Sequence, residues 1–211
     1  MNTQELKEAV KKAKESNPRK FTQTVELIVK LKGYDLKKDG EINMILDLPK
    51  MHRPATVCAM VGPELLDKAK NCDKVLTDKQ LDAIKDAEIA KMAREYDFFI
   101  AQIQLMPQLA KKMGRILGPL GKMPNPKRGQ VLSPKSDVKT IAEILKKSVK
   151  VSTSKQEAIT GVVGNEKMTD DELVKNIETI LDNIKKNLPS SQIAIDTVMI
   201  KTSMGKPIKL K

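Results

Sequence analysis

The chain of 211 residues has little of several residue types on which common functional sites depend. It holds only two cysteines and one histidine, so no metal site can be assembled from the usual nitrogen and sulfur donors. We expect both cysteines, Cys58 and Cys72, to be small buried apolar residues. With no tryptophan, two tyrosines and three phenylalanines, the chain has too few rings for a broad platform on which single-stranded bases stack. Any nucleic acid would therefore be recognised by its backbone and shape.

Long apolar runs are also absent from the sequence. No run approaches the roughly 18 residues that a membrane span requires. Segment 1–16 is charged throughout and lacks the apolar core of a secretory signal, so we expect a soluble, cytoplasmic protein. Its 39 lysines and arginines against 27 aspartates and glutamates leave a net charge of +12. That charge favours polyanionic partners, with nucleic acid ahead of an anionic membrane surface.

Carboxylates are missing between Asp97 and Asp137. Within this acid-free segment, residues 114–129 mix glycine with proline, which neither a helix nor a strand tolerates, so we predict a shaped loop. The segment carries seven cations without a local acidic partner: Lys111, Lys112, Arg115, Lys122, Lys127, Arg128 and Lys135. Because phosphate is the natural complement of such a surface, residue types alone make this loop the leading candidate for contact with nucleic acid.

Motifs for nucleotide chemistry are incomplete. Gly121-Lys122 suggests a phosphate-binding loop, but Ile116 stands where that motif needs glycine and Met123 where it needs a hydroxyl. No GxGxxG links a strand to a helix, which argues against dinucleotide binding. His52 has no nucleophile beside it in the sequence, and we interpret it as a surface-loop residue. A Rossmann-like enzyme that uses a nucleotide cofactor is thus a rival hypothesis, but the sequence lacks the glycine motif that such an enzyme needs.

Hydrophobic periodicity predicts amphipathic elements at both ends of the chain. Residues 24–32 and 41–48 alternate apolar with polar side chains, and we expect two strands that pair antiparallel through the turn between Gly33 and Gly40. Thr169 and Glu172 form a capping box at the start of the clearest helix. Further strands are predicted at 149–153, 158–164 and 192–203, and helices at 3–16 and 169–188.

The middle of the chain follows a different pattern. Residues 55–61 and 97–102 are short continuous apolar runs separated by helical stretches, which predicts a parallel sheet covered on both faces. A later helix over 137–148 is expected to turn four residues inward: Val138, Ile141, Ile144 and Leu145. We therefore predict an α/β protein. An α+β two-layer domain is built from residues 1–62 and 155–211, and a three-layer α/β domain of residues 63–154 is inserted into it.

The carboxyl-terminal segment MIKTSMGKPIKLK has four lysines and no acid after Asp196. The triplet Ser203-Met204-Gly205 interrupts its strand-like run with small residues that let another backbone approach closely. Near the amino terminus, Phe21 lies among basic residues, and it is the one aromatic residue whose sequence neighbours suit contact with RNA. Both segments are candidate contacts with nucleic acid, and a general DNA-binding protein is a third hypothesis.

Five segments together resemble the ribosomal protein L-one family, the first protein of the large ribosomal subunit. The most specific is MGRILGPLGKMPNPKRG. KFTQTVEL, DFFIAQ, GNEKMTDDELVKNI and KTSMGKPIKLK are similar to the corresponding family segments, in the same order across nearly the whole chain, and look closest to archaeal members. The resemblance implies that the inserted domain is Rossmann-like, and that the protein binds RNA rather than catalysing a reaction, without a cofactor or metal.

The resemblance also implies partners and a site. The family forms the mobile side stalk of the ribosome, binds large-subunit rRNA, assists release of deacylated tRNA from the exit site, and in bacteria and archaea can repress translation by binding its own mRNA. It implies a cytoplasmic protein, monomeric outside the ribosome, without a membrane partner. The positions matching the family's principal RNA surface are Lys20, Phe21, Thr22, Thr24, Glu26, Ser203, Met204 and Gly205. Auxiliary contacts are expected from Arg19, Lys167, Lys122, Lys127 and Arg128.

The chemistry of some of these side chains indicates what each could contribute to RNA binding. A carboxylate such as Glu26 can face RNA only as an acceptor from a 2′-hydroxyl or a base amine, so it would supply selectivity for RNA rather than attraction. Ser203 stands where the family often has threonine, and it keeps the hydroxyl. The family's Gly-rich basic turn is replaced here by PKMHRP, which leaves the roles of Lys50, His52 and Arg53 open.

Overall fold

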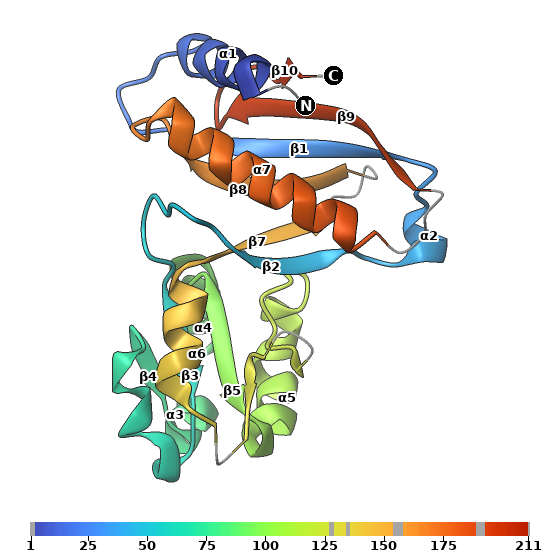
Figure 1. Cartoon of the computed structure of the whole chain (residues 1–211). Helices are drawn as coiled ribbons and strands as arrows, with labels where there is room; N and C mark the ends of the chain where they lie inside the picture. The colour runs from blue at the N-terminus through green and yellow to red at the C-terminus, as the bar shows by residue number, and fades with distance from the viewer. Residues whose placement is uncertain (1–2, 127–128, 134–135, 154–157, 189–192, 211) are drawn as a thin grey trace. The chain divides into compact units, whose positions relative to one another are not determined.

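The computed structural model describes residues 3–126, 129–133, 136–153, 158–188 and 193–210 (Figure 1). The chain has mixed α/β structure and divides into two compact units. Unit 1 comprises Met1–Arg53 and Ser148–Lys211, and unit 2 comprises Pro54–Lys147. Both divisions come earlier in the chain than the expected boundaries near residues 63 and 154. The reason is sheet membership, because the strand over 57–60 pairs within unit 2 and the strand over 148–153 pairs within unit 1.

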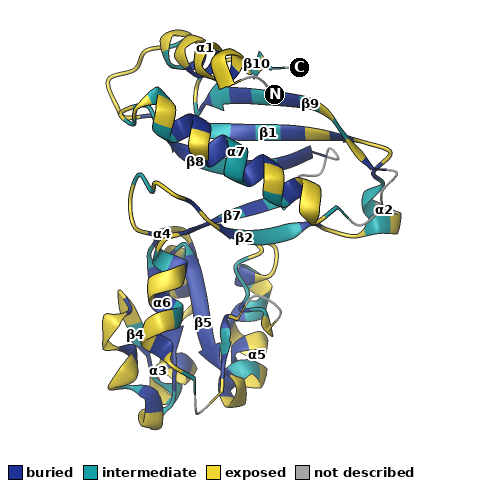
Figure 2. Ribbon diagram, in the orientation of Figure 1, coloured by how far each residue is buried: buried dark blue, intermediate teal, exposed yellow. Residues whose placement is uncertain are grey.

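Unit 1 is built on a six-stranded antiparallel sheet with the order β10-β9-β1-β8-β7-β2. Its strands are β1 (Thr24–Lys32), β2 (Asn43–Asp47), β7 (Ser148–Thr153), β8 (Ala158–Asn165), β9 (Ala194–Thr202) and β10 (Ile208–Lys209). Its helices are α1 (Thr3–Glu15), the short α2 (Leu36–Asp39) and α7 (Asp170–Lys186). The helices α1 and α7 share one apolar core with the sheet, and their outer sides are exposed (Figure 2).

Strand β1 shows why this layer forms. Its alternating residues Val25, Leu27, Val29 and Leu31 are buried against the helices, as the period-two pattern predicts. Thr24, Glu26 and Ile28 point to the other face of the sheet and are half-buried. The capping box predicted at Thr169 and Glu172 is present at the start of α7. This rigid two-layer frame fixes where the loops at each end of β1 emerge.

The predicted pairing of the first two strands is wrong. Strand β1 lies between β8 and β9, whereas β2 pairs with β7. Periodicity determines which face of a strand is buried, but it does not select the neighbour. Strand β1 pairs with the two long strands β8 and β9 along most of its length, which gives more ladder hydrogen bonds than pairing with the five-residue β2.

Unit 2 has a four-stranded parallel sheet with the order β4-β3-β5-β6. Its strands are β3 (Val57–Met60), β4 (Lys74–Leu76), β5 (Phe98–Gln102) and β6 (Val131–Leu132). Its helices are α3 (Asp78–Ala83), α4 (Asp86–Glu95), α5 (Met106–Leu117) and α6 (Val138–Lys146), with 3-10 turns η1 (Pro63–Leu65), η2 (Lys68–Asn71) and η3 (Ile103–Leu105). Every residue of β3 and β5 is buried, which confirms the predicted parallel sheet covered on both faces.

Two predictions for unit 2 need correction. Residues 114–117, placed in a loop by their glycine, belong to α5, whose residues Leu109, Met113 and Leu117 form a fully buried stripe at helical spacing. That stripe outweighs the poor helix propensity of Gly114. On α6, Ile144 is 49% exposed rather than inward, because the buried face runs through Val138, Ala142 and Leu145. None of the described helices is long and apolar enough to span a membrane.

Candidate nucleic-acid interface

Three loops of unit 1 meet at one end of the sheet. Strand β1 begins there, and its register pairs Thr24 with Asn165 of β8 and Val25 with Thr202 of β9. Antiparallel pairing therefore brings the loop before β1, the turn after β8 and the turn after β9 to the same edge (Figure 1). Residues near both ends of the sequence become neighbours by this register. We call the result the β1-end surface, formed by Lys20, Phe21, Thr22, Thr24, Glu26, Ser203, Met204 and Gly205.

Buried Gln23 ties the three loops together. Its side chain is fully buried, with 0% of the residue exposed. The Nε2 amide donates to the carbonyl oxygen of Asn17 at 2.7 Å and to Oε2 of Glu166 at 3.4 Å. Its Oε1 accepts from the backbone N–H of Met204 at 3.2 Å. The Asn17 Nδ2 in turn donates to the Met204 carbonyl at 2.7 Å, so both backbone polar groups of Met204 are held.

Two large apolar side chains project from this anchored backbone. Phe21 is 54% exposed and Met204 is 57% exposed, and they are the exposed large hydrophobic residues among the described part of unit 1. Exposed apolar side chains on a rigid edge, surrounded by polar groups, are typical of contact sites. Both residues were expected at the RNA surface, and the structure brings them to the same end of the sheet.

Ser203 and Gly205 have partners inside the protein. The Ser203 N–H donates to the Thr24 carbonyl at 3.0 Å, and its Oγ lies 3.3 Å from both the nitrogen and the oxygen of Thr24. A Cβ on Gly205 would lie 2.3 Å from Oγ1 of Thr202 and 3.0 Å from Oγ of Ser16. The turn thus requires glycine for internal packing, which is a different reason from the close approach of a foreign backbone.

The basic side chains at the β1-end surface are exposed to solvent, where they can meet phosphate. The carboxylate of the surface has a partner in the protein, because Oε2 of Glu26 pairs with Lys201 Nζ at 3.0 Å on the face of the sheet away from the helices. Its other oxygen can still accept a hydrogen bond. Four polar residues of the surface and its rim are exposed: Arg19, Lys20, Thr22 and Lys167. Thr24 and Ser203 are half-buried. The three exposed cations Arg19, Lys20 and Lys167 outnumber the two carboxylates of these loops and strands, Glu26 and Glu166.

The acid-free segment is less available than its composition implies. The Lys122 Nζ donates to the carbonyl oxygens of Ala93 at 2.9 Å and Tyr96 at 2.7 Å, where it completes the carboxyl-terminal end of α4. The Lys112 Nζ donates to the carbonyl of Asp82 at 2.6 Å. Lys127 and Arg128 lie outside the described residues. Lysines that cap helix ends add stability to unit 2, and composition cannot separate them from binding lysines.

The segment PKMHRP, residues 49–54, is anchored to α7. Asn176 is fully buried, accepts from the Lys50 N–H at 3.2 Å and donates to the Lys50 carbonyl at 2.7 Å. It also donates to the Val163 carbonyl of β8 at 2.8 Å. The backbone of Lys50 is therefore fixed, and the side chain of Lys50 is exposed.

Sequence reasoning missed Gln23, Asn17 and Glu166, which organise the β1-end surface. A signal for Gln23 was available. It has the same odd-numbered phase as the buried residues Val25 and Leu27, so a polar amide stands at a position where the strand pattern calls for an apolar side chain. A buried polar residue of this kind must be hydrogen-bonded, and its partners are then structurally important.

A buried glutamine lies at the point of unit 2 where a doubly wound sheet would hold a nucleotide. In doubly wound sheets a ligand binds beyond the carboxyl ends of the strands where the strand order reverses, here between β3 and β5. Buried Gln102 occupies that place, and its Oε1 accepts from the Gly62 N–H at 2.8 Å. This N–H therefore already has an acceptor within the protein. Within the described residues no cluster of three His, Cys, Asp or Glu fits a metal ion, and burial raises the pKa of the Cys58 thiol to about 12.

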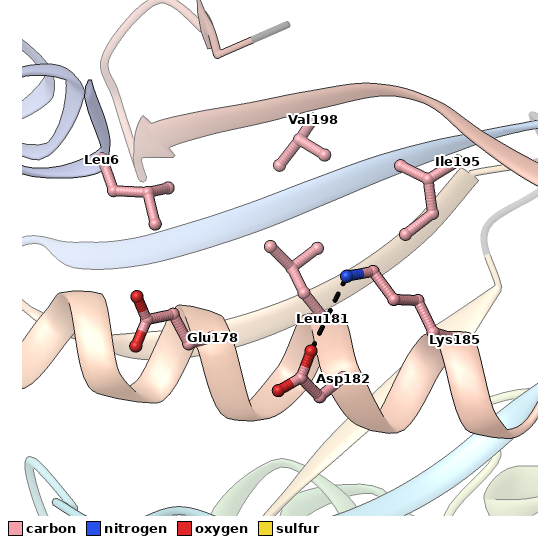
Figure 3. Close-up of a pocket in the computed structure, with 7 residues that line it drawn as sticks. All are labelled: Leu6, Glu178, Leu181, Asp182, Lys185, Ile195 and Val198. Atoms are coloured by element: carbon pink, nitrogen blue, oxygen red, sulfur yellow. Dashed lines mark ion pairs between the residues drawn. The ribbon is translucent and has the colours of Figure 1, made fainter. Parts of the chain in front are cut away.

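A pocket of about 490 Å³ lies on the helix-covered side of unit 1 (Figure 3). Leu6 of α1, Leu181 of α7, and Ile195 and Val198 of β9 form its apolar lining. Its polar residues come from α7, where Lys185 pairs with Asp182 at 3.7 Å and Glu178 accepts from Thr3 Oγ1 at 3.3 Å. This composition is typical of a seam between two helices packed on a sheet, and it lies on the opposite face from Glu26.

The fold and the charge define a class: a basic α/β protein in which a doubly wound unit is inserted into an antiparallel α+β unit that carries the candidate surface. Comparison with known proteins makes the assignment specific. The model of the Ribosomal protein L1p/L10e family matches residues 7–206, and the chain belongs to this family. The resemblance stated from the sequence is thereby confirmed.

Curated relatives agree with this assignment over nearly their full length. The large ribosomal subunit protein uL1 of Cenarchaeum symbiosum is 36% identical over 209 residues, covering 97% of this chain and 95% of that protein. The uL1 protein of Nanoarchaeum equitans is 37% identical over 207 residues, covering 95% and 97%. That of Methanocaldococcus jannaschii is 36% identical over 219 residues, covering 100% and 97%. All three organisms are archaea, in line with the archaeal wording of the last segments.

Proposed function

We propose that this protein is a structural component of the large ribosomal subunit that binds large-subunit rRNA at the mobile side stalk through the β1-end surface. One observation carries the choice of surface. Phe21 and Met204 project from a backbone that Gln23 and Asn17 hold in place, at an edge where exposed cations predominate. Family membership supports the choice of rRNA, since the relatives are large-subunit proteins.

Each group has a distinct part in this proposal. Arg19, Lys20 and Lys167 contact phosphates, which supplies affinity that falls steeply with salt. Phe21 stacks on a base or a sugar, and Met204 packs against the shallow groove of the RNA. The free oxygen of Glu26 accepts from a 2′-hydroxyl, which selects RNA over DNA. The protein acts by binding and positioning RNA, without a catalytic step.

Two further roles belong to the same proposal. The protein assists release of deacylated tRNA from the exit site, with auxiliary contacts from the acid-free segment of unit 2. It also represses translation by binding a mimic of the rRNA site on its own mRNA. Because one surface serves both rRNA and mRNA, the two RNAs compete for the protein. The protein is monomeric outside the ribosome. As part of the large ribosomal subunit, it is located in the cytoplasm.

Crosslinking the protein to total cellular RNA, followed by sequencing of the recovered fragments, tests the proposal. We expect the sequenced reads to concentrate in the side-stalk segment of large-subunit rRNA and in one mRNA. Added fragments of that rRNA segment should displace the mRNA from the protein. Reads distributed in proportion to RNA abundance would contradict it. Equal competition by duplex DNA at matched salt would favour the general DNA-binding hypothesis, and a thermal shift on adding nucleotides would favour the enzyme hypothesis.

A further inference from the structure

We propose that Gln23 is the positioning residue of the β1-end surface: its amide sets Phe21 and Met204 in the arrangement that RNA recognises, without touching the RNA. This inference rests on the proposed function, in which that surface binds rRNA. Gln23 is 0% exposed, so RNA cannot reach it without displacing the loops above. Any effect of Gln23 on binding must therefore pass through the residues it holds.

The hydrogen-bonding capacity of the Gln23 side chain is used for holding loops. A glutamine amide has two N–H donors and one carbonyl acceptor. The donors meet the Asn17 carbonyl and the Glu166 carboxylate, and the acceptor meets the Met204 N–H. These three partners lie on the loop before β1, the turn after β8 and the turn after β9. A single side chain thus links all three loops that form the surface.

Phe21 and Met204 depend on these bonds in different ways. The bond from Gln23 to Asn17 closes the segment 17–23, and Phe21 lies inside that closed segment. The bond to Met204 fixes the backbone from which the Met204 side chain projects. Without the amide, both segments must be ordered when RNA binds, and that loss of conformational freedom lowers affinity.

Burial of an amide at this position is not needed for the core. The neighbouring residues of the same phase, Val25 and Leu27, are apolar and fully buried. An apolar side chain in place of Gln23 would fill the same space, but it would leave the Met204 N–H and the Asn17 carbonyl without their partner. The amide therefore serves the geometry of the loops.

Replacement with methionine tests the idea. Gln23→Met keeps the length of the side chain and removes all three bonds. We expect its affinity for a transcript of the side-stalk rRNA segment to fall at least about tenfold, mainly through faster dissociation, at a temperature where circular dichroism shows a folded protein. The matched control is Gln102→Met, which removes a similarly buried amide (1% exposed) from unit 2. The control is expected to lose stability and to retain wild-type affinity.

Replacement with glutamate gives a readout that a general packing defect does not produce. In Gln23→Glu the acceptor for Met204 remains, but an ionised carboxylate cannot donate to Asn17 and is repelled by Glu166. Burial and the neighbouring carboxylate both raise the pKa of such a group. The protonated form can donate again, so affinity should recover as the pH falls from about 8 to about 5.5, a range above the usual glutamate pKa. Gln23→Met should show no recovery relative to wild type.

The outcomes separate this inference from the proposed function. If Met204→Asp weakens binding but Gln23→Met binds like wild type, the positioning role of Gln23 is overturned, and the proposal that the β1-end surface binds rRNA is retained. If neither variant weakens binding, the proposed function itself fails. Equal losses in Gln23→Met and Gln102→Met would reduce the effect to general stability and overturn the inference. If Gln23→Met does not fold, the pH response of Gln23→Glu decides: recovery supports the role, and a flat response overturns it.

Discussion

Replacing Met204 with aspartate probes the β1-end surface most sharply. The side chain of Met204 is 57% exposed, whereas its backbone nitrogen and oxygen are held by Gln23 and Asn17. The substitution therefore changes what faces the RNA and leaves the bonds that hold the turn. We expect the variant to fold with wild-type stability.

The size of the effect follows from two contributions. Full burial of a methionine side chain is worth about 1.5–3 kcal/mol. Because a little over half of Met204 is exposed and available for RNA to cover, its contact contributes about 1 kcal/mol. An aspartate near a phosphate adds repulsion of about 1 kcal/mol at a dielectric close to that of water. Together they predict a loss of about 2 kcal/mol, or roughly 30-fold in Kd.

A filter-binding assay with the side-stalk transcript at fixed salt measures this loss. Ile103→Asp is the matched control, since Ile103 is also 57% exposed but lies on unit 2. It introduces the same charge into the same protein and is expected to leave affinity nearly unchanged. Wild-type affinity in a folded Met204→Asp variant would refute the reasoning. Equal losses in both variants would show that net charge, rather than the β1-end surface, governs binding.

Three other substitutions test separate parts of the account. Gly205→Ala places a Cβ against Thr202 Oγ1, so the turn must shift, and filter binding should show RNA affinity lower by about tenfold. Thr169→Ala removes the cap of α7 and should lower the free energy of unfolding by about 1 kcal/mol in urea titrations, with RNA affinity unchanged. Burial raises the pKa of Cys58 from 9.0 to about 12, so the folded state binds the extra proton between these values and its stability falls with rising pH there. Cys58→Ala should lessen that fall in urea titrations across the same range.

The local sequence pattern predicted the helices and strands of this fold better than it predicted which strands pair with one another. The buried faces of β1 and α7 follow from hydrophobic periodicity, because burial repeats with the geometry of each element. The partner of β1 does not follow, since several strands of similar pattern compete and tertiary packing selects β8 and β9. Helix α5 was missed because glycine and proline in the segment suggested a loop, although its apolar stripe had helical spacing.

The candidate site shows the same division. Phe21 and Met204 were identified from their residue types and sequence context and then by resemblance, but only the pairing of Val25 with Thr202 explains why they lie at one end of the sheet. Gln23 was overlooked because glutamine usually lies at the surface, and its role depends on partners far away in the sequence. Lys122 was counted as a binding cation, whereas its ammonium group completes α4. A count of charged residues describes a binding surface only after the side chains that already have partners within the protein are left out.

The central claim is that specific RNA contact is made by the β1-end surface of unit 1 rather than by the acid-free segment of unit 2. Ultraviolet crosslinking of the full-length protein to the side-stalk transcript, with mass spectrometry to locate the crosslinked peptides, tests it directly. The account predicts crosslinks at Phe21, Met204 and the lysines beside them. Crosslinks confined to the peptides that contain Lys111, Arg115 and Lys122 would contradict it.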